Sequence, residues 1–208
     1  MCFSPEASFV AVAVLTFAGI AAVTKTTSKA QIFLAVTPFL FALQQLVEGF
    51  IWLHLKNQIG SPSLFIYEKK AYVFFAFLIW PFWNSLSVVF LEKIRWRRIL
   101  LFTLLFLGTA LAFLNLFTGI QQPIDVKVVG HSLQYIGGAP NQKISYLLIV
   151  ILPFFISSLK NAWTFGVYIG LGFILANIFF FYTFASVWCF IAALGSILIY
   201  KIIKDNPA

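Results

Sequence analysis

The longest uncharged run in this chain constrains its fold more than any other feature. Forty consecutive residues, from Asn161 to Tyr200, carry no charged side chain. An α-helix rises about 1.5 Å per residue, so one straight helix of this length would be roughly twice as long as the hydrocarbon layer of a bilayer is thick. We therefore expect the run to cross a membrane twice and to turn near Tyr182–Ser186.

Shorter uncharged runs divide the rest of the chain in the same way, because one span needs about 20 mostly apolar residues. The predicted spans are 7–24, 31–55, 71–91, 99–118, 144–159, 162–182 and 186–201, with a long turn-rich outer loop at 119–143. The sequence thus predicts a single transmembrane domain over residues 1–208, of the all-α class, built as a bundle of seven transmembrane helices. Pro-Phe pairs that begin at Pro38, Pro81 and Pro153 predict kinks in the second, third and fifth helices.

Composition and charge agree with a protein embedded in a lipid bilayer. The chain is 62% hydrophobic and 10% charged, whereas soluble domains carry about 25% charged residues. This excludes a soluble enzyme, a disulfide-rich secreted domain and a disordered chain. Nine of the 14 basic residues, including the cluster Lys93–Arg98, fall on one side of the predicted bundle. The positive-inside rule then places the N-terminus outside and the C-terminus in the cytoplasm, and it explains the net charge of +8 without a nucleic-acid partner.

Glu48 is the one acidic residue inside a predicted span. A charge in the middle of a membrane helix costs about 2.5–3.5 kcal/mol, so such a residue faces protein or water and is a functional candidate. Residues three or four positions away share its helix face, which predicts a polar pocket that opens to the outer side. The candidate ligand-binding residues are Glu48, Gln44, Gln45, Trp52, His131 and Trp188.

Both cysteines and both histidines of the chain are predicted on the outer side. One reading is a disulfide between Cys2 and Cys189, since the outside is oxidising. Another is a copper or zinc site that uses Cys2, Cys189 and His131, with His54 or Glu48 as further ligands. A third is a pair of unlinked thiols with two interfacial histidines. Neither a CxxC nor an HExxH motif is present, so the three readings stay open.

Four stretches of the chain resemble one family. They are MCFS at 1–4, QQLVEG at 44–49, His131 with Tyr135, and SVWCF at 186–190. They are similar to the DUF6629 family of bacterial multi-pass membrane proteins. The resemblance implies an integral protein of the bacterial cytoplasmic (inner) membrane and carries over no catalytic role.

These observations favour a small transport or ligand-binding protein in which Glu48 binds a cation or exchanges a proton. One alternative is a membrane-embedded metal- or thiol-dependent enzyme at the outer interface. Another is a non-catalytic accessory subunit, because small residues four apart at Gly166 and Gly170 allow close approach of a second chain or of an identical copy.

Overall fold

The computed structural model describes residues 4–56, 60–120, 123–137 and 143–207, with side chains for all of these except 118–120. Its α-helices are α1 (Pro5–Val23), α2 (Lys29–Ala35), α3 (Thr37–Leu55), α4 (Pro62–Phe74), α5 (Trp80–Val89), α6 (Arg95–Ile120), α7 (Lys143–Ile156), α8 (Ala162–Phe179), α9 (Phe184–Gly195) and α10 (Leu198–Asp205). A π-helical turn, η1 (Phe75–Ile79), joins α4 to α5, and a 3-10 turn, η2 (Phe181–Thr183), precedes α9. Strands β1 (Asp125–Val129) and β2 (Ser132–Ile136) complete the described elements.

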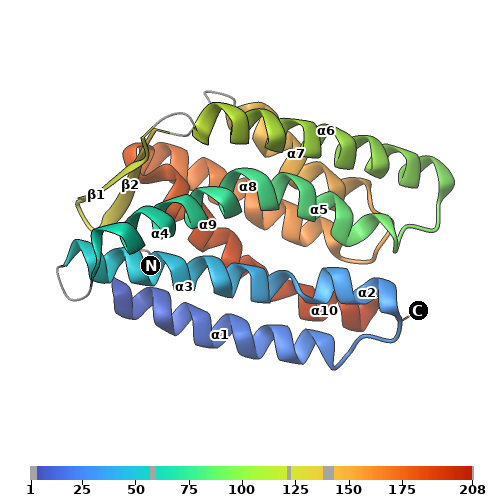
Figure 1. The fold of residues 1–208 in the computed structure, drawn as a ribbon. Helices are drawn as coiled ribbons and strands as arrows, with labels where there is room; N and C mark the ends of the chain where they lie inside the picture. Colours follow the sequence, from blue (N-terminus) through green and yellow to red (C-terminus); the bar gives the residue numbers. More distant parts are fainter. Residues whose placement is uncertain (1–3, 57–59, 121–122, 138–142, 208) are drawn as a thin grey trace.

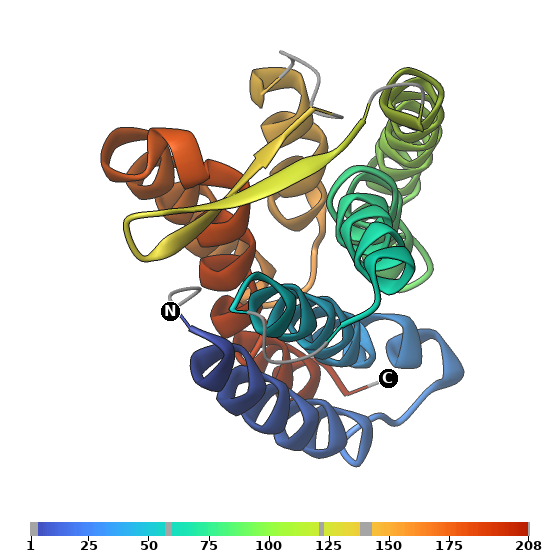
Figure 2. The same cartoon turned by 60° about the vertical axis from the view of Figure 1, so that its left-hand side comes forward.

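The helices pack side by side into a bundle with two different ends (Figures 1 and 2). We call the end that carries β1 and β2 the hairpin end. We call the opposite end, where the cluster Lys93–Arg98 lies at the start of α6, the basic end. Helix α1 begins at the hairpin end and the chain finishes at the basic end (Figure 1).

Among the residues that the structure describes, six helical segments are long and apolar enough to cross a membrane: Pro5–Val23, Lys29–Leu55, Pro62–Val89, Arg95–Phe117, Ala162–Phe179 and Phe181–Asp205. A further apolar helix, α7, has 14 residues. The predicted class is confirmed in its coarser form, since the chain is mostly helical and these helices are apolar enough to span a membrane. The number of crossings and the orientation stay predictions.

Large apolar side chains on the outside of the bundle agree with a lipid environment. Phe17 on α1 and Phe106 on α6 are each 73% exposed, and Phe117 is 68% exposed. Soluble monomers rarely expose contiguous apolar surface on this scale. These faces therefore suit contact with acyl chains.

The loop predicted at 119–143 contains an element that the sequence interpretation missed. Strands β1 and β2 pair in antiparallel register from Asp125 opposite Ile136 to Val129 opposite Ser132. Gly130 opens the two-residue turn with φ of 60°, a backbone region that glycine enters without strain. Val126 and Leu133 are buried, so the hairpin adds an apolar face to this end of the bundle.

The helix that contains the third predicted span is longer than that span. Helix α4 begins at Pro62 rather than at residue 71, because Lys69 and Lys70 lie within the helix and do not mark its start. The kinks predicted at two prolines coincide with breaks. Helix α2 ends at Ala35, shortly before Pro38, and the π-helical turn η1 ends two residues before Pro81. Pro153 lies inside α7, three residues before its end.

Helices α5 and α6 approach each other closely at Gly108. A Cβ atom at this position would lie deep inside van der Waals contact with the carbonyl oxygen of Pro81, and the Cγ2 atom of Ile149 would be 3.1 Å away. A backbone carbonyl cannot rotate away as a side chain can. The absence of a side chain at Gly108 therefore lets the two helices pack.

We expect Gly108→Ala to lower the free energy of unfolding by about 1–3 kcal/mol, the usual cost of overpacking a close-packed interior. Reversible unfolding in mixed micelles measures this loss. Gly170→Ala is the matched control, since an added Cβ at Gly170 meets nothing within 4 Å and the substitution improves helix propensity. Equal stability of the two variants would contradict the proposed close approach.

Candidate functional site

Glu48 lies at the contact between α3 and α9 and is fully buried, at 0% exposure. The side-chain amide of Gln45 donates a hydrogen bond to Oε2 of Glu48 at 3.2 Å. The hydroxyl of Ser186 donates to Oε1. Both carboxyl oxygens therefore accept hydrogen bonds from protein groups, and the side chain faces the interior of the bundle instead of lipid.

The polar stripe predicted on α3 continues onto neighbouring helices. Gln44 and Gln45 are also 0% exposed. Oε1 of Gln44 accepts a hydrogen bond from the indole N–H of Trp80 at 2.8 Å, and Trp80 stacks on Phe41 with ring centroids 3.7 Å apart. We call Gln44, Gln45, Glu48, Ser186 and Trp80 the Glu48 network. It connects three helices, α3, α5 and α9, in the middle of the bundle.

Trp52 lies one helical turn further along α3, toward the hairpin end. It is 3% exposed and packs in an apolar cluster with Tyr72 and with Val126 and Leu133 of the hairpin. Tyr135 of β2 stacks on Tyr72 with ring centroids 4.1 Å apart and an interplanar angle of 4°. Trp52 is therefore part of an apolar layer that lies between the Glu48 network and the hairpin.

The two histidines lie in different surroundings. Nδ1 of His54 is 2.7 Å from Oε2 of Glu68, and both side chains are largely buried. His131 is exposed at the turn of the hairpin, where it lines a shallow groove together with residues 179–183.

Cys189 is buried inside the bundle, and its sulfur faces the side chains of Gln44 and Tyr72. Within the part of the chain that the structure describes, no three His, Cys, Asp or Glu residues gather as ligands of a metal ion would. Cys2 lies outside the described residues. The disulfide and the metal site that include it therefore stay predictions.

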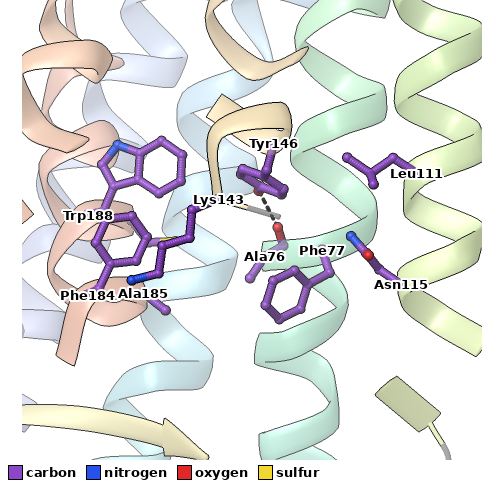
Figure 3. Close-up of a pocket in the computed structure, with 10 residues that line it drawn as sticks. Ala76, Phe77, Leu111, Asn115, Lys143, Tyr146, Phe184, Ala185 and Trp188 are labelled. Atoms are coloured by element: carbon purple, nitrogen blue, oxygen red, sulfur yellow. Dashed lines mark hydrogen bonds between the residues drawn. The ribbon is translucent and has the colours of Figure 1, made fainter. Parts of the chain in front are cut away.

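A cavity of about 90 Å³ lies next to the Glu48 network, enclosed by η1, α6, α7 and α9 (Figure 3). We call it the aromatic cavity. Its lining residues are Ala76, Phe77, Leu111, Asn115, Lys143, Tyr146, Phe184, Ala185, Trp188 and Cys189. The predicted binding residue Trp188 is among them and Glu48 is not. Ser186, the partner of Glu48, directly follows the cavity residue Ala185. One turn of α9 therefore contributes both to the Glu48 network and to the cavity wall.

The sequence explains how η1 is held against α7 at the cavity wall. In this π-helical turn the N–H of Trp80 donates to the carbonyl of Phe75, five residues earlier. The same register would bring the nitrogen of Pro81 opposite the carbonyl of Ala76, and proline has no N–H to donate. The hydroxyl of Tyr146 on α7 donates to the Ala76 carbonyl instead (Figure 3). Tyr146 thus satisfies a backbone group that the proline leaves without its helical partner.

Lys143 brings a positive charge to a wall whose other side chains are aromatic or apolar, apart from Asn115. Its Nζ atom lies 4.6 Å from the ring centroids of both Phe181 and Phe184. A cation over an aromatic face is held by the ring quadrupole. On the same helix as Phe184, Trp188 is fixed by its indole N–H, which donates to the carbonyl of Ile169 at 3.0 Å.

A larger groove of about 760 Å³ adjoins the aromatic cavity on the side of α4 and α6. We call it the α4–α6 groove. Phe77 and Asn115 line both spaces, so these two side chains stand between them. Its further lining residues are Ile66, Lys69, Lys70, Ala71, Val73, Phe74, Leu78, Ala112, Leu116, Pro123 and Ile124.

Sequence reasoning missed Tyr146, Lys143 and Asn115 as cavity residues. Asn115 did leave a signal, because it is a polar side chain inside a predicted span, like Glu48. Tyr146 and Lys143 gave no comparable signal, since tyrosine and lysine are common where membrane helices begin.

Comparison with known proteins places the chain in one family. No curated protein and no solved structure is significantly similar to it. Residues 1–208 match the sequence profile of a family described as a family of unknown function, DUF6629. The match covers the whole chain, so the resemblance noted from its four short stretches is confirmed. This protein is a member of the DUF6629 family.

Proposed function

We propose that this chain is a small integral membrane protein that binds a small ligand in the aromatic cavity and the adjoining α4–α6 groove, either to retain it or to carry it across the bilayer. The observation that carries the proposal is the cavity itself. Four aromatic side chains, one lysine and one asparagine surround a space beside a buried hydrogen-bonded carboxyl. Small-molecule sites have this composition: mostly apolar walls and a few fixed polar groups.

In this proposal the Glu48 network supports the site from behind. Ser186 ties α9 to Glu48, and the same helix presents Ala185, Trp188 and Cys189 to the cavity. Gln44 faces the thiol of Cys189 and so lies next to the cavity wall. Of the ligand-binding residues predicted from the sequence, Trp188 would contact the ligand, while Gln44, Gln45 and Glu48 would hold the wall in place.

We further propose that the hairpin end faces the outside of the cell. The basic end carries the cluster Lys93–Arg98, and basic loops remain in the cytoplasm. The ligand would then enter from the outer leaflet or from the outer aqueous phase.

Filling the cavity tests the proposed function. Ala185→Leu would place a larger side chain into a space of about 90 Å³. We expect native mass spectrometry of the protein released from its membrane to show one bound small molecule per chain in the wild type. We expect the bound fraction to fall at least about tenfold in the variant, because a filled cavity has no room for a ligand.

Ala110→Leu is the matched control, since Ala110 lies half-buried on α6 and does not line the aromatic cavity or the α4–α6 groove. It should retain the bound molecule. A wild type without any small-molecule adduct, or one whose adduct survives Ala185→Leu unchanged, would overturn the proposal.

A further inference from the structure

The charges that line the aromatic cavity and the α4–α6 groove are all positive. Lys143 lines the cavity, and Lys69 and Lys70 line the groove. Among the described residues that line either space, none is acidic. Apart from the lysines and Asn115, the walls consist of apolar and aromatic side chains and of Tyr146.

The acidic residue next to Lys69 on α4 has another partner. Glu68 precedes Lys69 on α4, but its carboxylate lies 2.7 Å from Nδ1 of His54. The ammonium of Lys69 lies over the ring of Phe65, 4.6 Å from its centroid. A cation–π contact leaves the outward side of an ammonium free to meet an anion.

The two ends of the groove differ in charge. Lys69 and Lys70 lie about two turns after the start of α4 at Pro62, near the hairpin end. Leu78 lies further along the same segment and Ala112 lies opposite it on α6, so the inner part of the groove has no charge. A ligand that fits this arrangement has a charged head toward the hairpin end and an apolar tail toward the middle of the bundle.

We propose that the ligand is an amphiphile with one acyl chain and an anionic head, of the chemical class of a free fatty acid. This inference rests on the proposed function and names its ligand class. Charge-assisted hydrogen bonds from lysine to a carboxylate are stronger than those to a neutral head, and a cationic head would be repelled. The groove volume of about 760 Å³ lies within the usual range for one small ligand, about 300–1,000 Å³. This size favours a single chain over a two-chain phospholipid.

Three probes that share one tail and differ in charge test the head group. Dodecanoate, dodecanol and dodecyltrimethylammonium are titrated by calorimetry into the full-length protein in phosphatidylcholine nanodiscs, at about pH 8, where a free carboxyl group is ionised. We expect dodecanoate to bind at least about tenfold more tightly than dodecanol, and the cationic probe to bind least.

Lys143→Gln should weaken dodecanoate about tenfold and leave dodecanol unchanged, since only the charged head meets the ammonium. The double variant Lys69→Gln with Lys70→Gln should also weaken the binding of dodecanoate and leave that of dodecanol unchanged. Lys201→Gln, an exposed lysine at the basic end, is the control and should change neither probe.

The failures of the two proposals are distinguishable. If dodecanol binds as tightly as dodecanoate and Ala185→Leu blocks both, the anionic head is wrong and the ligand-binding function stands. If phosphatidylglycerol in the nanodisc displaces dodecanoate completely, the single-chain assignment is wrong. If no dodecyl probe binds and no native adduct depends on Ala185, both proposals are wrong.

Discussion

We expect the replacement of Glu48 with alanine to lower the free energy of unfolding by about 4 kcal/mol. The substitution removes the acceptor of the Ser186 hydroxyl and of the Gln45 amide in a region with no solvent exposure. Each buried donor left without a partner costs about 1–3 kcal/mol, and the void left by the side chain adds a further cavity cost. Reversible unfolding in mixed micelles measures the total.

Glu48→Gln is the control for this prediction. The amide has almost the same volume as the carboxyl and keeps an acceptor oxygen for Ser186, so we expect it to lose less than about 1.5 kcal/mol. Ser186→Ala completes a double-mutant cycle with Glu48→Ala, and we expect a coupling energy of about 1 kcal/mol or more. If Glu48→Ala stayed within about 0.5 kcal/mol of the wild type, as surface substitutions do, the network would have no structural role.

The apolar helices could be predicted from the sequence because hydrocarbon excludes charge. Runs without charged residues therefore locate the helices, and the residue that breaks such a run, Glu48, marks a place where protein replaces lipid. The uncharged runs did not locate the helix ends. Lys69 and Lys70 lie inside α4, since lysine side chains near the end of a membrane helix can reach the interface.

The cavity could not be predicted, because it depends on how separate helices are rotated against each other. Lys143 and Tyr146 on α7 meet Phe184 and Trp188 on α9 only in the folded bundle. The hairpin was not predicted for another reason. The glycines and prolines of 119–143 indicated a loop. Apolar residues nevertheless recur at every second position, at Val126 and Val128 and at Leu133 and Tyr135, which is the pattern of two strands.

The hairpin also connects to the cavity through a chain of contacts. Tyr135 of β2 stacks on Tyr72 of α4. The hydroxyl of Tyr72 donates to the carbonyl of the cavity residue Ala185 at 3.3 Å. The hairpin, α4 and α9 therefore share one contact path at the end of the bundle where we propose that the ligand enters.

At the basic end, the Glu92 carboxylate ties the loop between α5 and α6 to the loop between α7 and α8. Its oxygens accept hydrogen bonds from the N–H of Ser158 at 2.6 Å, the hydroxyl of Ser158 at 2.7 Å and the N–H of Ile94 at 2.8 Å. Burial by itself raises the pKa of Glu92. The three hydrogen bonds and the charge of Arg97 outweigh it and hold the pKa below its ordinary value.

We expect Glu92→Ala to lower the free energy of unfolding by about 3 kcal/mol at pH 7, because hydrogen bonds to a charged group contribute about 1.5–3 kcal/mol each and water replaces part of them. Glu92→Gln should lose less, because the amide keeps the size of the side chain and one acceptor oxygen. Unfolding of all three proteins is measured from neutral to acidic pH.

A carboxyl group whose pKa is lowered by folding stabilises the protein fully above its unfolded-state pKa, about 4.3 for glutamate. That stabilisation disappears as the pH falls through the folded-state pKa. The difference in stability between the wild type and Glu92→Gln should therefore be constant near neutral pH and shrink below about pH 4. The contributions of the other acidic residues to the pH dependence cancel in this difference, because both proteins contain those residues. A difference that is independent of pH would show that Glu92 acts by its shape and not by its charge.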